Sequence, residues 1–322
     1  MLIASAAVAA LALPAAAADY RAPRTASGAP DLGGDWTNRS LTSLERPKDF
    51  KTLVATGEEV AVYETKRRGQ PPEAPPDDTV GGLESEWWET DVGLARIRGQ
   101  ARTSWLVSPA DGQLPLRAEA VAFFKARRER NKTNYDNPET RSTGERCLST
   151  EASGPPLMNG GYNDNYQFVQ TGDVLAIHAE YMHDVRVVRI GATQHLPRQV
   201  RVWMGDSIGR WDGETLVIET TNFTPAEVQA PDGDGSADMR VVEKLTRIGP
   251  NQLHYYFRVE NPKVFAQGWE GEQVFDRLAQ PIYEFACHEG NYSLPHILAG
   301  GREIDRNPPP PEPPKAETAA AP

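Results

Sequence analysis

The second half of the chain is a series of short segments in which apolar and polar residues alternate, each ended by residues that favour turns. Val174 to Tyr181 follows Thr171-Gly172-Asp173, for example, and Leu216 to Phe223 follows Asp212-Gly213. Alternation with a period of two residues is typical of a half-buried strand. The segments that share this pattern are Tyr166 to Gln170, Val174 to Tyr181, Asp184 to Ile190, Gln199 to Met204, Leu216 to Phe223, Met239 to Ile248, Leu253 to Glu260, Gly271 to Arg277 and Ile282 to Cys287.

These segments follow one another through short connections, with no helix-length segment between them. About eight or nine such strands in succession predict a mainly β fold over residues 165–300. We expect an antiparallel meander that closes as a lipocalin-like barrel or folds as a sandwich. Parallel α/β folds are disfavoured because their crossovers need helices.

The chain outside this region has a different character. Residues 19–115 are predicted to form an irregular extended arm, with a short strand at Thr103 to Val107. Residues 116–164 are predicted to hold one prominent helix, Leu116 to Lys132, followed by a long loop. Residues 301–322 are rich in proline and predict a disordered tail.

The N-terminus resembles a secretory leader. Leu2 to Leu13 is apolar, and the small residues Ala15 to Ala18 form a cleavage signal before Asp19, so residues 1–18 predict a signal peptide. A retained anchor is the alternative, because no Lys or Arg precedes the apolar run. No later run approaches the roughly 20 apolar residues that a spanning helix needs. We therefore expect a periplasmic or secreted protein with no membrane span in the mature chain.

Net charge and cysteine content further limit the expected binding partners and the expected compartment. The formal net charge of -11 would repel nucleic-acid phosphates, which excludes nucleic acid as an expected partner. The two cysteines, Cys147 and Cys287, predict a disulfide in an oxidising compartment. Separately buried thiols and one reactive cysteine are the alternatives. Two cysteines alone cannot make a structural zinc site.

Three motifs resemble those of a family of exported bacterial hypothetical proteins common in Acidobacteria and sphingomonads. The motifs are Trp203-Met204-Gly205-Asp206-Ser207-Ile208-Gly209-Arg210-Trp211-Asp212-Gly213-Glu214-Thr215-Leu216-Val217, Pro30-Asp31-Leu32-Gly33-Gly34-Asp35-Trp36 and Glu284-Phe285-Ala286-Cys287-His288-Glu289-Gly290-Asn291. They span most of the mature chain. The resemblance implies export and a β-rich architecture, and it carries no activity over to this sequence.

Glu243 is the first candidate for chemistry. In the strand Met239 to Ile248, residues two apart share a face, so Glu243 lies with Val241 and Leu245 among apolar neighbours. A carboxylate there has its charged form disfavoured and could act as a general acid or base. The alternative is that Glu243 forms an ion pair with Arg186 or Arg210. In the catalytic hypothesis, Arg186 or Arg210 would instead stabilise negative charge that develops on the ligand.

His183 is the second candidate, because imidazole is suited to proton transfer near neutral pH. Asp206 is its expected orienting carboxylate, and a structural hydrogen bond is the alternative role. The histidines form no His-x-His pair, so we expect no metal site. We expect no cofactor either.

Two motifs match known functional patterns but lack the neighbouring residues or elements that those patterns require. Gly205-Asp206-Ser207-Ile208-Gly209 matches the nucleophile elbow, but a strand follows where a helix is required, so Ser207 is not expected to be a nucleophile. Asp232, Asp234, Ser236 and Asp238, with Glu243 eleven positions after Asp232, imitate the ligand spacing of a calcium loop. Ala237 stands where glycine is needed, and a strand from Met239 replaces the second helix, so an acidic hydrated loop is expected instead.

Aromatic residues in the last strands are candidates for a ligand cavity. Tyr255, Phe257, Trp269 and Phe275 alternate with polar residues, and Tyr166 ends an Asn-rich segment that could form a rim. The alternative is that they fill the core.

The leading hypothesis is an exported barrel that binds a small, partly apolar organic ligand and acts on it by acid–base catalysis, as a lyase, isomerase or hydrolase. His183 and Glu243 would exchange protons. The alternatives are a non-catalytic carrier that uses the same cavity, and an envelope interaction module.

Overall fold

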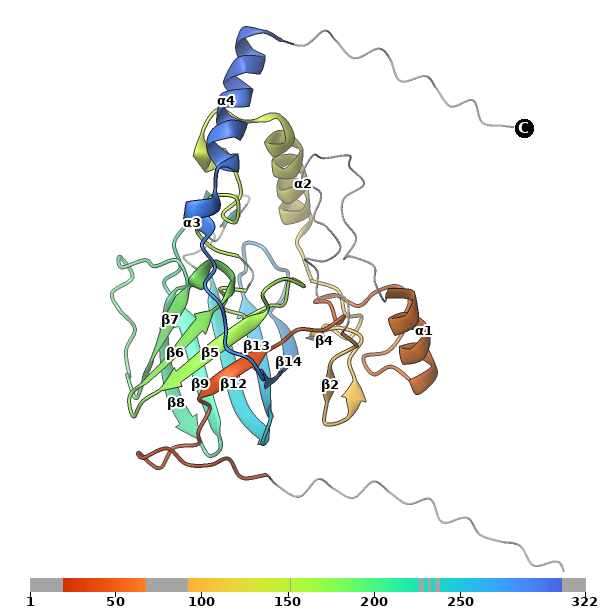
Figure 1. The fold of residues 1–322 in the computed structure, drawn as a ribbon, viewed down its shortest axis with the longest axis vertical. Helices are drawn as coiled ribbons and strands as arrows, with labels where there is room; N and C mark the ends of the chain where they lie inside the picture. The colour runs from red at the N-terminus through yellow and green to blue at the C-terminus, as the bar shows by residue number, and fades with distance from the viewer. Residues whose placement is uncertain are drawn as a thin grey trace, which may run out of the picture.

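The computed structural model describes residues 20–67, 92–150, 152–225, 229–230, 233–234 and 238–308. Its main feature is a ten-stranded sheet in the order β1-β5-β6-β7-β8-β9-β12-β13-β14-β4, in which β1 also pairs with β14 (Figure 1). That second pairing closes a ring of nine strands, while β4 adds to the outside of β14. The prediction of a mainly β fold is confirmed, and of the two expected architectures the strands form the closed barrel and not the sandwich.

The strands of the ring share a length of four to ten residues. They are β1 (Gly34–Thr37), β5 (Asn165–Gln170), β6 (Val174–Ala179), β7 (Val185–Ile190), β8 (Asp206–Asp212), β9 (Thr215–Thr221), β12 (Arg240–Gly249), β13 (Gln252–Glu260) and β14 (Trp269–Arg277). The short strands elsewhere are β2 (Arg96–Ile97), β3 (Gln100–Ala101), β4 (Leu106–Ser108), β10 (Gln229–Ala230) and β11 (Gly233–Asp234).

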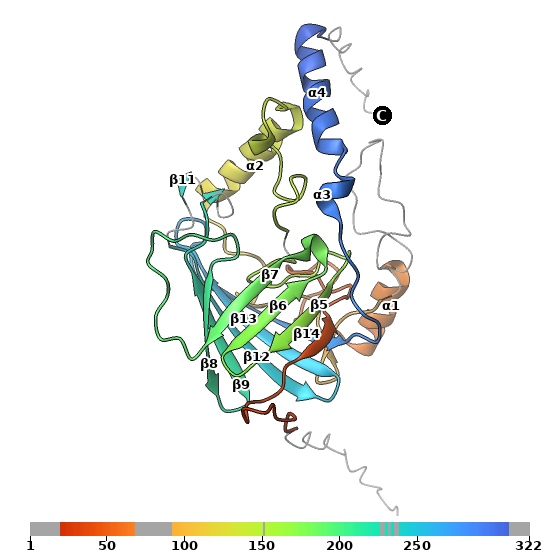
Figure 2. The same cartoon turned by 60° about the vertical axis from the view of Figure 1, so that its left-hand side comes forward.

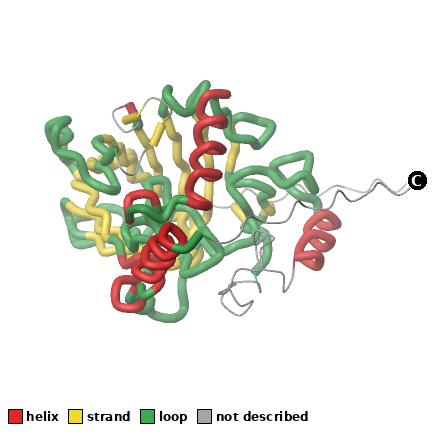
Figure 3. The backbone as a smooth tube through the Cα atoms, turned by 90° about the horizontal axis from the view of Figure 1, so that it is seen from above, coloured by secondary structure: helices red, strands yellow, loops and turns green. Residues whose placement is uncertain are grey.

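Helices lie outside the ring. They are α1 (Gly57–Arg67), α2 (Ala118–Thr133), α3 (Cys287–Gly290) and α4 (Ser293–Arg306), with single 3-10 turns at Pro138–Thr140 and Tyr181–His183. Helices α2, α3 and α4 rise from one end of the barrel, and α1 lies at its side (Figures 1 and 2). Seen from above, α2 and α4 lie in front of the barrel end (Figure 3). None of the described helices has both the length and the apolar character needed to cross a bilayer.

The alternation along β12 has the consequence expected from the sequence. Val241, Glu243 and Leu245 are fully buried in the interior, while Lys244 is exposed. The register pairs Glu243 with Phe257 of β13 and Ile218 of β9. Strand alternation therefore places a carboxylate inside the barrel.

The N-terminal arm contributes the strand that closes the ring. Trp36 of β1 is fully buried and pairs with Tyr166 on one side and Arg277 on the other. Gly34 has φ +129°, a backbone conformation that favours glycine, and the Arg277 guanidinium lies in the space that a Cβ would occupy. The sequence predicted only an irregular arm here, because a four-residue strand is too short to show alternation.

One pair of neighbours in the ring is parallel, which corrects the expected antiparallel meander. Strand β7 pairs with β8 through Val188 to Ile190, and the chain returns between them through residues 191–205. Gln199 to Met204, predicted as a strand, belongs to this return and makes only an isolated bridge, between Val202 and Phe223. A parallel pair needs such a long crossover.

The predicted strand at Ile282 to Cys287 is also wrong. The chain there is irregular and then enters α3 and α4, so residues 301–306 of the predicted disordered tail are helical. The predicted disulfide is present: Cys147 and Cys287 are bonded with their Cα atoms 5.8 Å apart. It ties α3 to the loop that follows α2.

Candidate functional site

A buried ion pair crosses the interior of the barrel. Arg186 of β7 donates from Nη1 to Glu243 Oε2 at 2.6 Å and from Nη2 to Oε1 at 2.7 Å. The Tyr255 hydroxyl donates to the same Oε1 at 2.7 Å and accepts from the Leu157 N–H at 3.0 Å. Arg186 is 2% exposed and Glu243 is 0% exposed, so the structure shows the ion-pair alternative for Glu243.

Electrostatics favour the charged form of Arg186 and the neutral form of Tyr255 in this network. Burial by itself would lower the pKa of Arg186, but the adjacent Glu243 carboxylate outweighs burial and raises that pKa. Burial, together with the charge of Glu243, raises the pKa of Tyr255 well above its ordinary value. The guanidinium therefore stays charged, and the phenol stays neutral and acts as a hydrogen-bond donor to the carboxylate.

His183 lies elsewhere. It is exposed at the end of the turn Tyr181–His183, and its Nδ1 is 2.8 Å from the Phe285 carbonyl oxygen. In the described part of the chain, no hydrogen bond joins His183 to Glu243 or Asp206. The arrangement does not support the predicted proton exchange, and His183 makes the structural hydrogen bond that was its alternative role.

Asp206 orients a different histidine. His195 Nδ1 lies 2.9 Å from Asp206 Oδ2, which also accepts from the Leu196 N–H at 2.9 Å, and Arg189 contacts both carboxylate oxygens. Sequence analysis missed this contact because no local motif links a loop histidine to the start of β8. The remaining candidate, Arg210, is exposed on β8, away from the Glu243 carboxylate.

Ser207 is a buried strand residue. Its Oγ is 2.8 Å from the Thr220 hydroxyl, and the strand that contains it runs on into β9. The strand-to-helix turn of a nucleophile elbow is absent from this region, as the sequence indicated.

Four of the five aromatic candidates fill the barrel. Tyr166, Tyr255, Phe257 and Phe275 are fully buried, and Phe275 contacts Tyr166 and Tyr255 with ring centroids 5.3 and 5.6 Å apart. These four residues form the core rather than a ligand cavity. Trp269 lies next to these buried aromatic residues, with its ring centroid 5.7 Å from that of Phe257.

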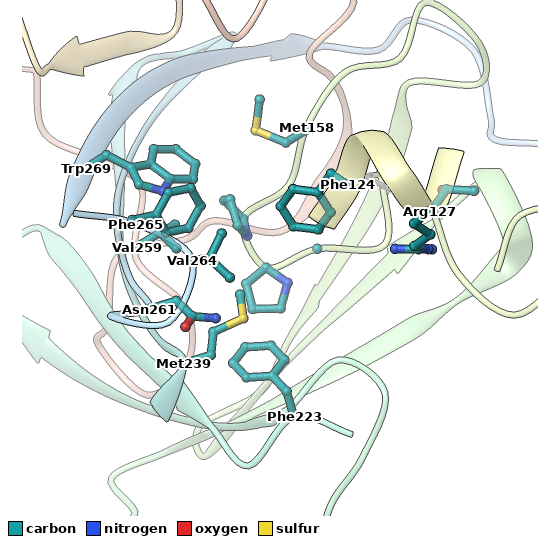
Figure 4. Close-up of a pocket in the computed structure, with 14 residues that line it drawn as sticks. Phe124, Arg127, Met158, Phe223, Met239, Val259, Asn261, Val264, Phe265 and Trp269 are labelled. Carbon is teal, nitrogen blue, oxygen red and sulfur yellow. The ribbon is translucent and has the colours of Figure 1, made fainter. Parts of the chain in front are cut away.

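A cavity of about 370 Å³ opens at this end of the barrel, between the strands and α2. We call it the α2 cavity. Figure 4 shows Trp269, Phe265, Val259 and Val264 gathered on one side of it and Phe124 of α2 on the other. The residues that line it are Phe124, Arg127, Thr150, Gly154, Pro155, Pro156, Met158, Phe223, Met239, Val259, Asn261, Val264, Phe265 and Trp269.

The walls of the α2 cavity are mainly aromatic, aliphatic and thioether groups, and its volume is in the range of small-molecule sites. Two wall atoms, Thr150 Oγ1 and Trp269 Nε1, are shielded from water and have no hydrogen-bond partner among the described residues. An unmatched polar group costs about 1–3 kcal/mol. Only Trp269 was predicted as a ligand contact, because the other walls come from segments without a common sequence pattern.

A second cavity, of about 570 Å³, lies where β7 and β8 begin to diverge. Its charged residues are already matched: Arg186 by Glu243, Arg189 by Asp206, Asp184 by the Ser153 hydroxyl and Arg201 by the Phe223 carbonyl oxygen. These charged groups therefore already have partners within the protein.

Metal ligation has no candidate cluster in the described ranges, where no three His, Cys, Asp or Glu side chains are grouped to hold an ion. Asp232 and Ser236 of the calcium-like segment lie outside the described residues. Glu243, which would complete that loop, is committed to Arg186.

Comparisons with known proteins find no matching family model and no matching curated protein. Among solved structures, a secretary abundant heat soluble protein from Ramazzottius varieornatus matches 35% of this chain and 70% of its own, at 9% identity and a TM-score of 0.23. A point mutant of the fluorescent protein UnaG matches 42% of this chain and 86% of its own, at 15% identity and a TM-score of 0.24. The closed ring of nine paired strands, rather than these likenesses, identifies the barrel.

Proposed function

We propose that this protein is a non-catalytic carrier that binds a small, partly apolar organic molecule in the α2 cavity, outside the cytoplasm. The observation that carries the proposal is the cavity itself. The barrel is filled along its interior by Tyr255, Phe257 and Phe275, and an apolar space opens at the end that α2 covers.

The walls favour an apolar ligand. Moving apolar surface from water into such a site gains about 25 cal/mol per Å². Phe223, Val259 and Trp269 are nearly fully buried parts of the barrel, so this half of the site is held in place by the core beneath it. A site that exists before the ligand arrives loses little free energy to ordering.

Binding without turnover fits the lining better than catalysis. Among the described residues that line the α2 cavity there is no His, Asp, Glu, Cys, Lys or Tyr. General acid–base chemistry needs a group that exchanges protons within hydrogen-bonding reach of the ligand. The carrier alternative is therefore favoured over the enzyme.

Export is supported by the leader-like residues 1–18 and by the Cys147–Cys287 disulfide, a bond that persists in oxidising compartments. A carrier outside the cytoplasm would accept partly apolar molecules from an aqueous environment, where they are poorly soluble.

The test is a fluorescence titration with N-phenyl-1-naphthylamine, a neutral apolar probe that becomes fluorescent in dry sites. We expect saturable binding to the wild type, and a loss of at least about tenfold in affinity in Met239→Trp, whose indole would occupy the cavity. The matched control is Val169→Trp, because Val169 is 51% exposed on β5 and does not line the cavity.

Equal binding by Met239→Trp and the wild type, with both variants folded by circular dichroism, would reject the α2 cavity as the site. Mass spectrometry of extracts of envelope and plant-derived metabolites, incubated with the protein, separates the other functions. A carrier returns its ligand unchanged, an enzyme converts it, and an interaction module retains none.

A further inference from the structure

We infer that the ligand of the α2 cavity is an amphipathic carboxylate whose anionic group is bound by Arg127. This inference rests on the proposed function and specifies its ligand class. Arg127 is the one charged side chain among the described residues that line the cavity. It projects from α2 beside Phe124, on the side of the cavity away from Trp269 (Figure 4).

Arg127 has no acceptor within the described part of the protein. It makes no hydrogen bond and no ion pair there, although it is only partly exposed to solvent. Two arginines that are more buried behave differently: Arg186 is paired with Glu243, and Arg102 with Glu272 at 2.7 Å. The guanidinium donors of Arg127 are unmatched by the described residues, and a carboxylate is the group that a guanidinium pairs with best.

The surroundings of Arg127 disfavour its charge. Burial lowers the pKa of Arg127, and the neighbouring charge of Arg130 lowers it further. The helix α2 carries five basic and two acidic residues, in a chain whose formal net charge is -11. An anion bound beside Arg127 would relieve this local excess of positive charge, and the basic helix would attract anions toward the cavity.

The two sides of the cavity then match the two parts of the ligand. Trp269 and Phe265, whose ring centroids are 5.7 Å apart, offer a desolvated surface for the apolar part. Arg127 offers a planar pair of N–H donors for the carboxylate. The geometry orients the ligand with its charged end toward α2 and its apolar end toward β14.

The experiment compares dodecanoate with dodecanol, which share an apolar chain and differ in charge. Both are measured by displacement of N-phenyl-1-naphthylamine below their critical concentrations for aggregation. We expect dodecanoate to bind the wild type about tenfold more tightly than dodecanol, because charge-assisted hydrogen bonds to Arg127 are absent for the alcohol. In Arg127→Met, dodecanoate should fall to the affinity of dodecanol, while dodecanol should be unchanged.

Two further variants separate a specific contact from general charge. Arg127→Lys keeps the positive charge but lacks the planar pair of N–H donors. It should show part of the preference for dodecanoate that Arg127→Met loses. Arg128→Met removes one charge from an exposed position on the same helix, and it should keep most of the preference. An equal loss in Arg128→Met and Arg127→Met would overturn the inference.

The outcomes also distinguish the inference from the proposed function. Equal binding of dodecanoate and dodecanol by the wild type would reject the role of Arg127 and leave the carrier in place. If neither the two ligands nor the neutral probe binds, the carrier itself is rejected.

Discussion

Arg186 and Glu243 face each other across the interior of the barrel, joined by two hydrogen bonds of 2.6 and 2.7 Å with almost no exposure to solvent. Moving two charges out of water is costly, and the pair is tolerated because each charge meets the other in good geometry. Tyr255 adds a third hydrogen bond to the carboxylate. The pair links β7 to β12, which are not neighbours in the ring.

Removing one partner of this pair should therefore lower the free energy of unfolding more than removing both partners. Glu243→Leu leaves the Arg186 charge buried and unpaired, and we expect a loss of about 3–5 kcal/mol in the free energy of unfolding. The double variant Arg186→Met with Glu243→Leu should lose less than Glu243→Leu alone. Urea denaturation of the two single variants and the double variant measures this coupling. Additive losses would show that the two residues do not stabilise each other.

Asp206 should make the protein sensitive to acid. Burial opposes its ionisation, but the Leu196 N–H, His195 and Arg189 outweigh burial and lower the pKa of Asp206 below its ordinary value of 3.8. A carboxyl whose pKa is lowered by folding contributes stability above its unfolded pKa and loses that stability as the pH falls through its folded pKa.

We therefore expect the free energy of unfolding to fall below about pH 4 and to fall less steeply in Asp206→Asn. Urea denaturation between pH 7 and pH 3 checks this difference. Exposed Asp212→Asn on the same strand is the control. If the free energy of unfolding falls equally with decreasing pH in the wild type and in Asp206→Asn, the role given to Asp206 is contradicted.

Gly271 should be intolerant of a side chain. It pairs with Phe257 across β13 and β14, and a Cβ there would lie 2.3 Å from Phe257 Cζ. Since Phe257 is fully buried, it cannot move without disturbing the core, and Gly271→Ala should lose about 1–3 kcal/mol. Gly249→Ala, where the nearest atom is 3.9 Å away, is the matched control. Thermal unfolding of both variants gives the comparison.

The disulfide should stabilise the C-terminal helices α3 and α4 more than the barrel. Cys147 and Cys287 are 140 residues apart in the sequence, and only Cys287 belongs to the C-terminal helical segment. In the double variant Cys147→Ser with Cys287→Ser, amide hydrogens of α4 should exchange faster while those of β12 and β13 change little. Uniform acceleration across the chain would indicate that the bond stabilises the whole fold.

The fold could be predicted where side-chain alternation reflects burial on one face. Val241, Glu243 and Leu245 show this on β12, and the ion pair with Arg186 was among the alternatives that alternation allowed. Gln199 to Met204 alternates too, but it belongs to the crossover that the parallel β7–β8 pair requires. Alternation does not specify the direction of a strand's neighbour.

The candidate site was harder to predict than the fold. Phe124, Phe223, Met239 and Trp269 come from one helix and from strand ends that are distant in sequence, and only closure of the barrel brings them together. The aromatic residues with the clearest alternation, such as Phe257, are those that fill the core. A strand pattern shows which side chains point inward, and it does not show where the interior stops being filled.

The most direct test of the account is a crystal structure of the protein with 12-bromododecanoate, in which anomalous scattering locates the bromine. If the ligand binds in the α2 cavity as proposed, the bromine lies beside Trp269 and Phe265, and the carboxylate lies within hydrogen-bonding distance of the Arg127 guanidinium. Bromine bound elsewhere, such as in the cavity between β7 and β8, with the α2 cavity unoccupied, would contradict it.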